Sequence, residues 1–211
     1  MSKKSIIFIV VVLLALDQAV KIWIKTHMTI GESITVFPNW FFIYFIENPG
    51  AAFGMQLGGS YGKLVLSLSR LVLSGFLIWH IGRLIKNRAP MGMVMGFGLV
   101  LAGAIGNIID SAFYGLVFSE STYTSVATLF PEGGGYAGFL HGKVVDMLYF
   151  PLFSGVYPSW LPWIGGNSFT FFSPIFNFAD SYITVGSIYL ILFQRNLLNS
   201  NLPGGRSTSH E

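Results

Sequence analysis

Four segments of this chain are apolar over about twenty residues each, the length that an α-helix needs to cross the hydrocarbon core of a bilayer. A soluble domain usually carries about a quarter charged residues, whereas only 10% of this chain is charged. The pattern predicts an all-α membrane protein with four transmembrane helices, built as a single integral membrane domain over residues 1–211. The expected helices cover residues 5–25, 63–85, 91–113 and 174–195.

The first apolar segment has two interpretations. Its positive start at Lys3 and Lys4, followed by a short hydrophobic core, is typical of a cleaved signal peptide. However, no small-x-small cleavage site follows, and the sequence runs directly into LDQAVKIWIK. We therefore expect this segment to be retained as the first transmembrane helix.

The distribution of lysine and arginine predicts the orientation, because these residues concentrate in cytoplasmic loops. Seven of them fall on one side of a four-helix arrangement and three on the other. We expect both termini in the cytoplasm, long outer loops over about 26–62 and 114–173, and a disordered tail over about 198–211. The seven are Lys3, Lys4, Arg83, Lys86, Arg88, Arg195 and Arg206, and the three are Lys25, Lys63 and Lys143.

The outer loops contain two stretches rich in the β-branched and aromatic residues of strands, WFFIYFIE and GKVVDMLYF. We expect them to form a small extracytoplasmic β-sheet at the membrane–water interface, where Trp and Tyr are also enriched. In the third apolar segment, small residues four apart predict close packing of helices. These are Gly92 with Gly96, and Ala102 with Gly106.

Composition and motifs exclude several kinds of chemistry. The chain has no cysteine, which removes disulfides, thiol catalysis and cysteine-bound metals. Its four histidines lack the spacing of zinc motifs, GxSxG does not occur, and GGSYGKL departs from a phosphate-binding loop at two required positions. A net charge of +3 without a run of Lys or Arg gives no nucleic-acid footprint. We expect no metal, no cofactor and no nucleic-acid partner.

Charged side chains near a bilayer are costly, so each is a candidate functional residue. Six lie within or beside the apolar segments, and all except Arg70 fall toward the outer ends of the expected helices. Their common depth predicts one polar cluster. The six are Asp17, Lys21, Arg70, Asp110, Asp146 and Asp180.

The spacing of the polar residues predicts which of them are neighbours. Asp17 and Lys21 are four apart on one helix and share a face; the pair is either a self-neutralising anchor or part of a site, and the sequence leaves both open. In two other places an asparagine stands three residues before an aspartate, where its amide can bond that carboxylate or a ligand. These pairs are Asn107 with Asp110 and Asn177 with Asp180.

Two carboxylates that face each other in a low-dielectric pocket share one proton, because both cannot ionise cheaply. Such a pair supplies a general acid and a general base, which is how aspartic proteases activate water. Cysteine, serine and zinc chemistry each lack necessary parts here. Paired aspartates are therefore the remaining catalytic arrangement if the chain is an enzyme.

Five sequence blocks, in order over most of the chain, resemble those of the lipoprotein signal peptidases, also called signal peptidase II. The resemblance implies a bacterial intramembrane aspartic peptidase of four helices, in the inner membrane, that cuts lipid-modified prolipoproteins before the diacylglyceryl-modified cysteine. We expect a monomer in contact with membrane lipid. The blocks are DQAVK (17–21), ENPGAAFGM (47–55), GAIGNIID (103–110), VVDM (144–147) and FNFADS (176–181).

The position of residues in these blocks implies their roles. Asp146 and Asp180 are implied to be the catalytic dyad, near the outer leaflet. The other implied residues bind substrate or support the dyad. They are Asn48, Gly50, Ala51, Ala52, Asn107, Asn177, Asp17, Lys21 and Asp110.

The chain departs from the family pattern in two ways. The family has an Arg directly after the GNxxD block, where this chain has Ser111, and Lys143 is a candidate substitute. The spacings from Asp110 to Asp146 and from Asp146 to Asp180 are also longer than in compact members. The inserts, including FPEGGGYAGFLHG and YPSWLPWIGGN, form a lid, contact a partner, or are tolerated loop growth.

Two other classes of protein stay open on sequence. A small carrier would use the acids as ion or proton ligands, although carriers usually show repeats or helices broken at mid-membrane. A purely structural membrane protein leaves the polar cluster unexplained. Replacement of Asp146 or Asp180 by Asn distinguishes a peptidase from a carrier, because a peptidase variant loses turnover and keeps substrate binding.

Overall fold

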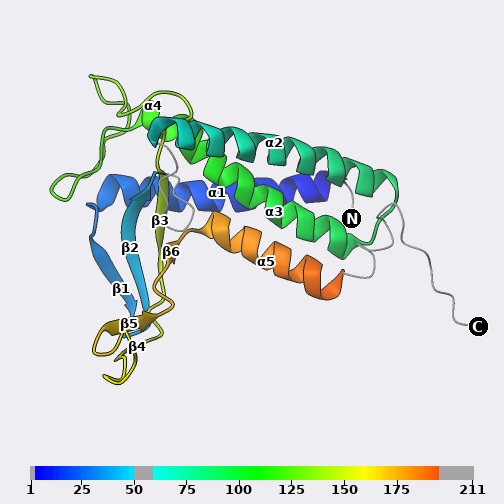
Figure 1. The fold of residues 1–211 in the computed structure, drawn as a ribbon. Coiled ribbons are helices and arrows are strands. Elements are labelled where there is room, and N and C mark those ends of the chain that lie inside the picture. Colours follow the sequence, from blue (N-terminus) through cyan, green and yellow to red (C-terminus); the bar gives the residue numbers. More distant parts are fainter. Residues whose placement is uncertain (1–2, 50–58, 195–211) are drawn as a thin grey trace, which may run out of the picture.

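Long helices run side by side through the molecule and carry a small β-sheet at one end (Figure 1). The computed structural model describes residues 3–49 and 59–194. The long helices are α1 (Lys3–His27), α2 (Gly59–Lys86), α3 (Met91–Ile109) and α5 (Phe178–Phe193).

Three helical segments are long and apolar enough to cross a membrane, namely Lys4–His27, Leu64–Lys86 and Met91–Val117. The fourth, α5, has 16 residues, which is short of the about 20 that a crossing needs. The predicted multi-helix membrane protein is therefore confirmed, but only three of the four predicted spans are. The predicted tail over 198–211 lies outside the described residues.

The third span is longer than the sequence predicted. After Ile109 the chain continues through a π-helical turn, η1 (Asp110–Tyr114), and then through the short α4 (Gly115–Val117). Wide turns of this kind occur often at functional sites, because they change the direction in which side chains project. Here the wide turn begins at Asp110, one of the predicted site residues.

The predicted β-sheet is present as four antiparallel strands in the order β1-β2-β3-β6. Both predicted strand sequences lie in its centre, as β2 and β3. The last strand, β6, occupies residues that the sequence assigned to the fourth helix, so α5 begins at Phe178 instead of Pro174. The strands are β1 (Ser33–Phe37), β2 (Phe41–Asn48), β3 (Val144–Tyr149) and β6 (Ile175–Phe176).

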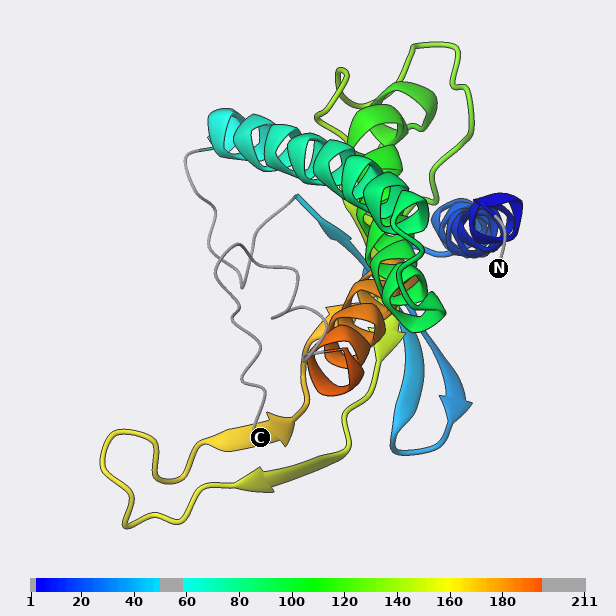
Figure 2. The same cartoon turned by 90° about the vertical axis from the view of Figure 1, so that its right-hand side faces the viewer.

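Two further strands, β4 (Phe153–Val156) and β5 (Ser168–Phe171), form a separate antiparallel hairpin. Figure 2 looks approximately along the helices and shows this hairpin, in yellow, extending sideways from the bundle. The hairpin belongs to one of the inserts that lengthen the outer loop.

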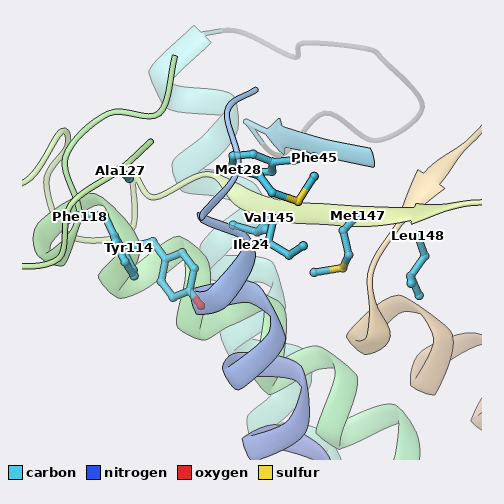
Figure 3. Close-up of a cluster of buried hydrophobic side chains, with 9 residues drawn as sticks. All are labelled: Ile24, Met28, Phe45, Tyr114, Phe118, Ala127, Val145, Met147 and Leu148. Atoms are coloured by element: carbon cyan, nitrogen blue, oxygen red, sulfur yellow. The ribbon is translucent and has the colours of Figure 1, made fainter. Parts of the chain in front are cut away.

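A cluster of buried hydrophobic side chains fixes the sheet to the helix ends (Figure 3). Ile24 of α1 and Met28, directly after that helix, pack with Val145 and Met147 of β3, and burying each such side chain contributes about 1.5–3 kcal/mol. Since alternate side chains of a strand point to opposite faces, anchoring these two residues directs Asp146 away from the cluster. The cluster comprises Ile24, Met28, Phe45, Tyr114, Phe118, Ala127, Val145, Met147 and Leu148.

The outer faces of the helices are apolar. Side chains such as Phe8 of α1, Val72 of α2 and Leu192 of α5 are more than half exposed in the isolated chain. Soluble proteins rarely expose contiguous apolar surface of this extent, and a bilayer covers it in a membrane protein.

Small residues of α3 allow α5 to approach closely, as the sequence predicted. A Cβ added at Gly96 would overlap the Leu190 side chain, and one added at Gly103 would overlap the carbonyl oxygen of Ala179. The second overlap is the more severe, because a backbone carbonyl at a helix start cannot swing away as a side chain can. This contact sets the position of the N-terminus of α5.

We expect Gly103→Ala to destabilise the protein by about 1–3 kcal/mol, the usual cost of overpacking a close contact. Thermal unfolding in detergent measures the change. Gly75→Ala is the matched control, because Gly75 lies on an exposed helical face with no atom within 4 Å of an added Cβ, where alanine improves helix propensity. An equal loss of stability in both variants would contradict the close-contact explanation.

Candidate active site

The ammonium of Lys21 lies at the centre of a buried polar network. Its Nζ is 2.9 Å from Oδ2 of Asp17 and 2.9 Å from Oδ2 of Asp110, and it donates to Oδ1 of Asn107 at 3.1 Å. Lys21 and the two carboxylates are fully buried. Such charges are tolerated in a low dielectric only when they are paired and hydrogen-bonded. The charge of the lysine therefore stabilises both buried carboxylates, and the carboxylates stabilise the lysine.

Asp17 also holds the start of α5. Its Oδ1 accepts a hydrogen bond from the backbone N–H of Ala179 at 3.0 Å, in the first turn of that helix. The first N–H groups of a helix have no partner within it and attract negative charge. The ion pair expected from the sequence is therefore present, and its acid also positions the start of α5.

Asp110 connects the same network to the sheet. Its Oδ2 accepts from the backbone N–H of Val145 at 3.2 Å, and its Oδ1 accepts from Nε2 of Gln18 at 2.9 Å. Val145 precedes Asp146 on β3, so this bond fixes the strand next to the predicted catalytic residue. Sequence reasoning missed Gln18, although it belongs to the DQAVK block.

Asn177 joins the two predicted catalytic aspartates. It is the N-cap of α5, and its Oδ1 accepts from the backbone N–H of Asp180 at 2.9 Å. Its Nδ2 donates to Oδ1 of Asp146 at 2.7 Å and to Oδ1 of Asn107 at 3.1 Å. A fully buried amide thus links the strand that carries one acid to the helix that carries the other.

Asn107 completes the connection. Its Oδ1 accepts from Lys21 and from Asn177, so its Nδ2 must face the other way, and it donates to Oδ1 of Asp180 at 2.8 Å. The lysine therefore sets the orientation of an amide that in turn holds an acid. Four segments distant in sequence converge in this arrangement.

Electrostatics perturb the pKa of Asp146, the first of the two acids. Burial, followed by the neighbouring charge of Asp180, raises the pKa of Asp146 to about 7. Side-chain hydrogen bonds from Asn177 and Asn48 and the charge of Lys21 act in the opposite direction without cancelling the rise. A carboxyl group of this pKa beside a second carboxylate can hold the proton of the pair near neutral pH, and can then give it up as a general acid.

The remaining predicted residues lie in different surroundings. Ser111 is buried and its hydroxyl donates to the backbone carbonyl of Asn107 at 3.0 Å. Lys143 lies 3.3 Å from Oε2 of Glu47 and 3.1 Å from Oε1 of Glu120. Gly50, Ala51 and Ala52, predicted to line the substrate site, lie outside the described residues.

Arg70 of α2 was set apart from the cluster by sequence position. In the structure it is partly buried and interacts electrostatically with Asp180, Asp110 and Asp146. In the sequence, the only indication of a role for Arg70 was its position inside an apolar helix. Its proximity to the acids could not be predicted, because the direction in which its side chain points depends on how α2 packs on the other helices.

A second ionic cluster was also missed. Lys25 pairs with Glu47, donates to Oγ of Ser121 at 2.8 Å and lies 4.9 Å from the ring centre of Tyr136. Lys25 comes one helical turn after Lys21, a spacing that the sequence offered as a signal. The cluster ties the end of α1 to β2 and to the insert over 118–142.

The chemistry available is that of two carboxyl groups held by amides. Across residues 3–49 and 59–194, no group of three or more His, Cys, Asp or Glu side chains is arranged to hold a metal ion. One acid with a raised pKa and one acid at a helix start can activate a water molecule as acid and base.

Comparison with known proteins points to one family. A family model described as signal peptidase (SPase) II matches residues 9–195. A lipoprotein signal peptidase of Porphyromonas gingivalis is 49% identical over 205 residues, which cover 97% of this chain and 88% of that protein. One of Amoebophilus asiaticus is 36% identical over 200 residues, covering 92% of this chain and 80% of that protein.

Solved structures agree with this likeness. A bacterial membrane enzyme determined by the in meso method at 2.3 Å resolution has a TM-score of 0.59 and 25% identity, covering 95% of this chain and 93% of that chain. Another at 1.9 Å resolution has a TM-score of 0.59 and 27% identity, covering 90% and 92%. The resemblance carried by the five sequence blocks is thereby confirmed, and a peptidase is favoured over a carrier.

We expect Lys21→Met to destabilise the protein by about 3–5 kcal/mol, because it leaves two buried carboxylates without their cation. Thermal unfolding in detergent measures the loss, with Lys86→Met, at an exposed helix end, as the control. Addition of Asp110→Asn should restore part of the stability, since it removes one uncompensated charge. No restoration would mean that the lysine acts by packing.

Proposed function

This chain belongs to the signal peptidase II family of aspartic peptidases, and from that premise we propose that it removes signal peptides from diacylglyceryl-modified prolipoproteins by cutting before the lipidated cysteine. The observation that carries the proposal is the bridge made by Asn177, which donates to Asp146 and caps the helix of Asp180. One buried amide thus connects the carboxylate of Asp146 to the helix start that carries Asp180, and Asp180 lies near enough to raise the pKa of Asp146.

In the proposed mechanism the pair begins with one proton, on Asp146, while Asp180 is ionised. The helix N-terminus and the amide of Asn107 favour negative charge on Asp180. Asp180 takes a proton from water, the hydroxyl adds to the scissile carbonyl carbon, and Asp146 protonates the carbonyl oxygen. The tetrahedral diol then returns a hydroxyl proton to Asp146, Asp180 protonates the amide nitrogen, and the C–N bond breaks. The pair ends with its original proton.

The proposed roles of the other residues follow their contacts. Asn107 and Asn177 orient the two acids, and Asp17, Lys21 and Asp110 hold the helices and strand that carry them. Asn48 hydrogen-bonds Asp146 and, with Gly50, Ala51 and Ala52, is proposed to line the substrate site. Lys143 contributes through Glu47, which precedes Asn48 on β2.

The proposed location is the bacterial inner membrane, with both termini cytoplasmic and the active site near the outer leaflet. A lipidated substrate must reach its peptidase from within the bilayer, and the acids lie where the helices meet the sheet. We propose that α5 serves as the fourth span and that the chain acts as a single-domain monomer.

We expect Asp146→Asn and Asp180→Asn each to lower the cleavage rate by about 10²–10⁴-fold or more, because each removes one partner in proton transfer. A gel-shift assay with purified protein in detergent and a diacylglyceryl-modified prolipoprotein measures the rate. Both variants should still bind substrate. Glu132→Gln, which removes an exposed carboxylate in the insert, is the control. Wild-type rates in either aspartate variant would refute the dyad.

We expect kcat/KM to fall as pH rises above about 7. The raised pKa of Asp146 means that its proton is held below pH 7 and lost above it, and loss of the general acid lowers the rate about tenfold per pH unit. Cleavage rates at limiting substrate between about pH 6 and pH 9 test this. A flat profile across that range would contradict the assignment of the acid.

A further inference from the structure

The β4–β5 hairpin exposes large aromatic side chains at its tip. Trp160 is 77% exposed and Trp163 is 100% exposed. The strands below them add Phe153 and Phe171, each more than half exposed. Tryptophan is a large, partly apolar side chain that is usually covered at least on one face. The exposure of this tip in the isolated chain therefore indicates that another surface or medium covers it.

The exposure is a property of an ordered hairpin. At the tip, the N–H of Gly166 donates to the carbonyl of Tyr157 at 2.9 Å, and the N–H of Gly165 donates to the carbonyl of Leu161 at 3.0 Å. Below it, the rings of Phe153 and Phe171 stack with centroids 4.7 Å apart. The backbone thus holds the tryptophans outward in a defined turn.

The hairpin also carries no charge. Between Asp146 and Asp180 the sequence contains no Asp, Glu, Lys, Arg or His. The other insert, over 118–142, contains Glu120, Glu132, His141 and no tryptophan. The β4–β5 hairpin could therefore enter a less polar medium without burying a charge, whereas the insert over 118–142 could not.

The place of the hairpin indicates which medium this is. It extends sideways from the bundle at the level of the sheet, at the helix ends (Figures 1 and 2). The chain passes from β5 through β6 directly into α5, whose Val185, Ile188 and Leu192 are exposed and apolar. The hairpin therefore continues the lipid-facing surface of the bundle at the depth of the bilayer surface, where tryptophan is preferred.

We propose that the β4–β5 hairpin is a membrane-surface anchor, in which Trp160 and Trp163 enter the headgroup region of the leaflet nearest the sheet. An isolated two-stranded hairpin is only marginally stable in water, and lipid contact supplies the missing apolar cover. Without basic side chains, this contact is independent of anionic lipid. The inference concerns membrane contact alone and does not depend on the peptidase function.

Because the chain has no cysteine, a single introduced cysteine can be labelled specifically while every other residue is unchanged. Ile164→Cys, beside Trp163, is labelled with a nitroxide and reconstituted in phosphatidylethanolamine–phosphatidylglycerol vesicles. Tyr123→Cys is the matched control, because Tyr123 is exposed in the charged insert. The relaxation of each label by lipid-soluble oxygen and by a water-soluble nickel chelate measures how accessible that label is to lipid and to water. Ser159→Cys serves as a second reporter if the first variant does not fold.

The label at 164 should favour oxygen, and the label at 123 should favour nickel. Replacement of Trp160 and Trp163 by Ser should lower the oxygen-to-nickel ratio at 164 several-fold, and vesicles without phosphatidylglycerol should give the same ratio as those with it. The proposal is overturned if the label at 164 is as accessible to nickel as the control, or if it becomes shielded only when other membrane proteins are present, which would indicate a protein partner.

Discussion

The structure depends on the neutralisation of one buried cation. Lys21 sits where water does not reach, and its charge is balanced by Asp17 and Asp110 at 2.9 Å each. An unpaired charge in that place would cost several kcal/mol, so the helices that carry the three residues have little freedom to separate. Asp17 reaches from α1 to the start of α5, and Asp110 reaches from the end of α3 to β3. One ion cluster therefore fixes the relative positions of four elements.

The predicted dyad inherits its asymmetry from this framework. Asp146 lies on a buried strand and Asp180 at the start of a helix, so the first acid meets desolvation and the second meets a favourable dipole. Asn177 and Asn107 transmit the arrangement, because each amide has its orientation fixed by the groups on both of its ends. The proposed acid and base roles are consistent with the two types of secondary structure that meet here.

The long inserts are attached at the edge of this framework. The insert over 118–142 is tied to α1 and β2 through Lys25, Glu47 and Ser121. The second insert leaves and returns as the β4–β5 hairpin. Lengthening a peripheral loop costs little free energy. The spacings between Asp110, Asp146 and Asp180 can therefore be long without disrupting the hydrogen bonds of the polar network.

The sequence by itself determined the membrane class, three spans, the two central strands and the family, because hydrophobic length, residue type and ordered motifs are local properties. It also grouped Asp17, Lys21 and Asp110 at one depth. Only the tertiary structure decided that β6 shortens α5, that a π-helical turn follows α3, and that Arg70 interacts electrostatically with the acids. It also decided the hydrogen-bond partners, such as Ala179 for Asp17, which are 162 residues apart. The packing of helices and strands determines which residues so far apart in sequence become hydrogen-bond partners, and a local sequence pattern does not predict them.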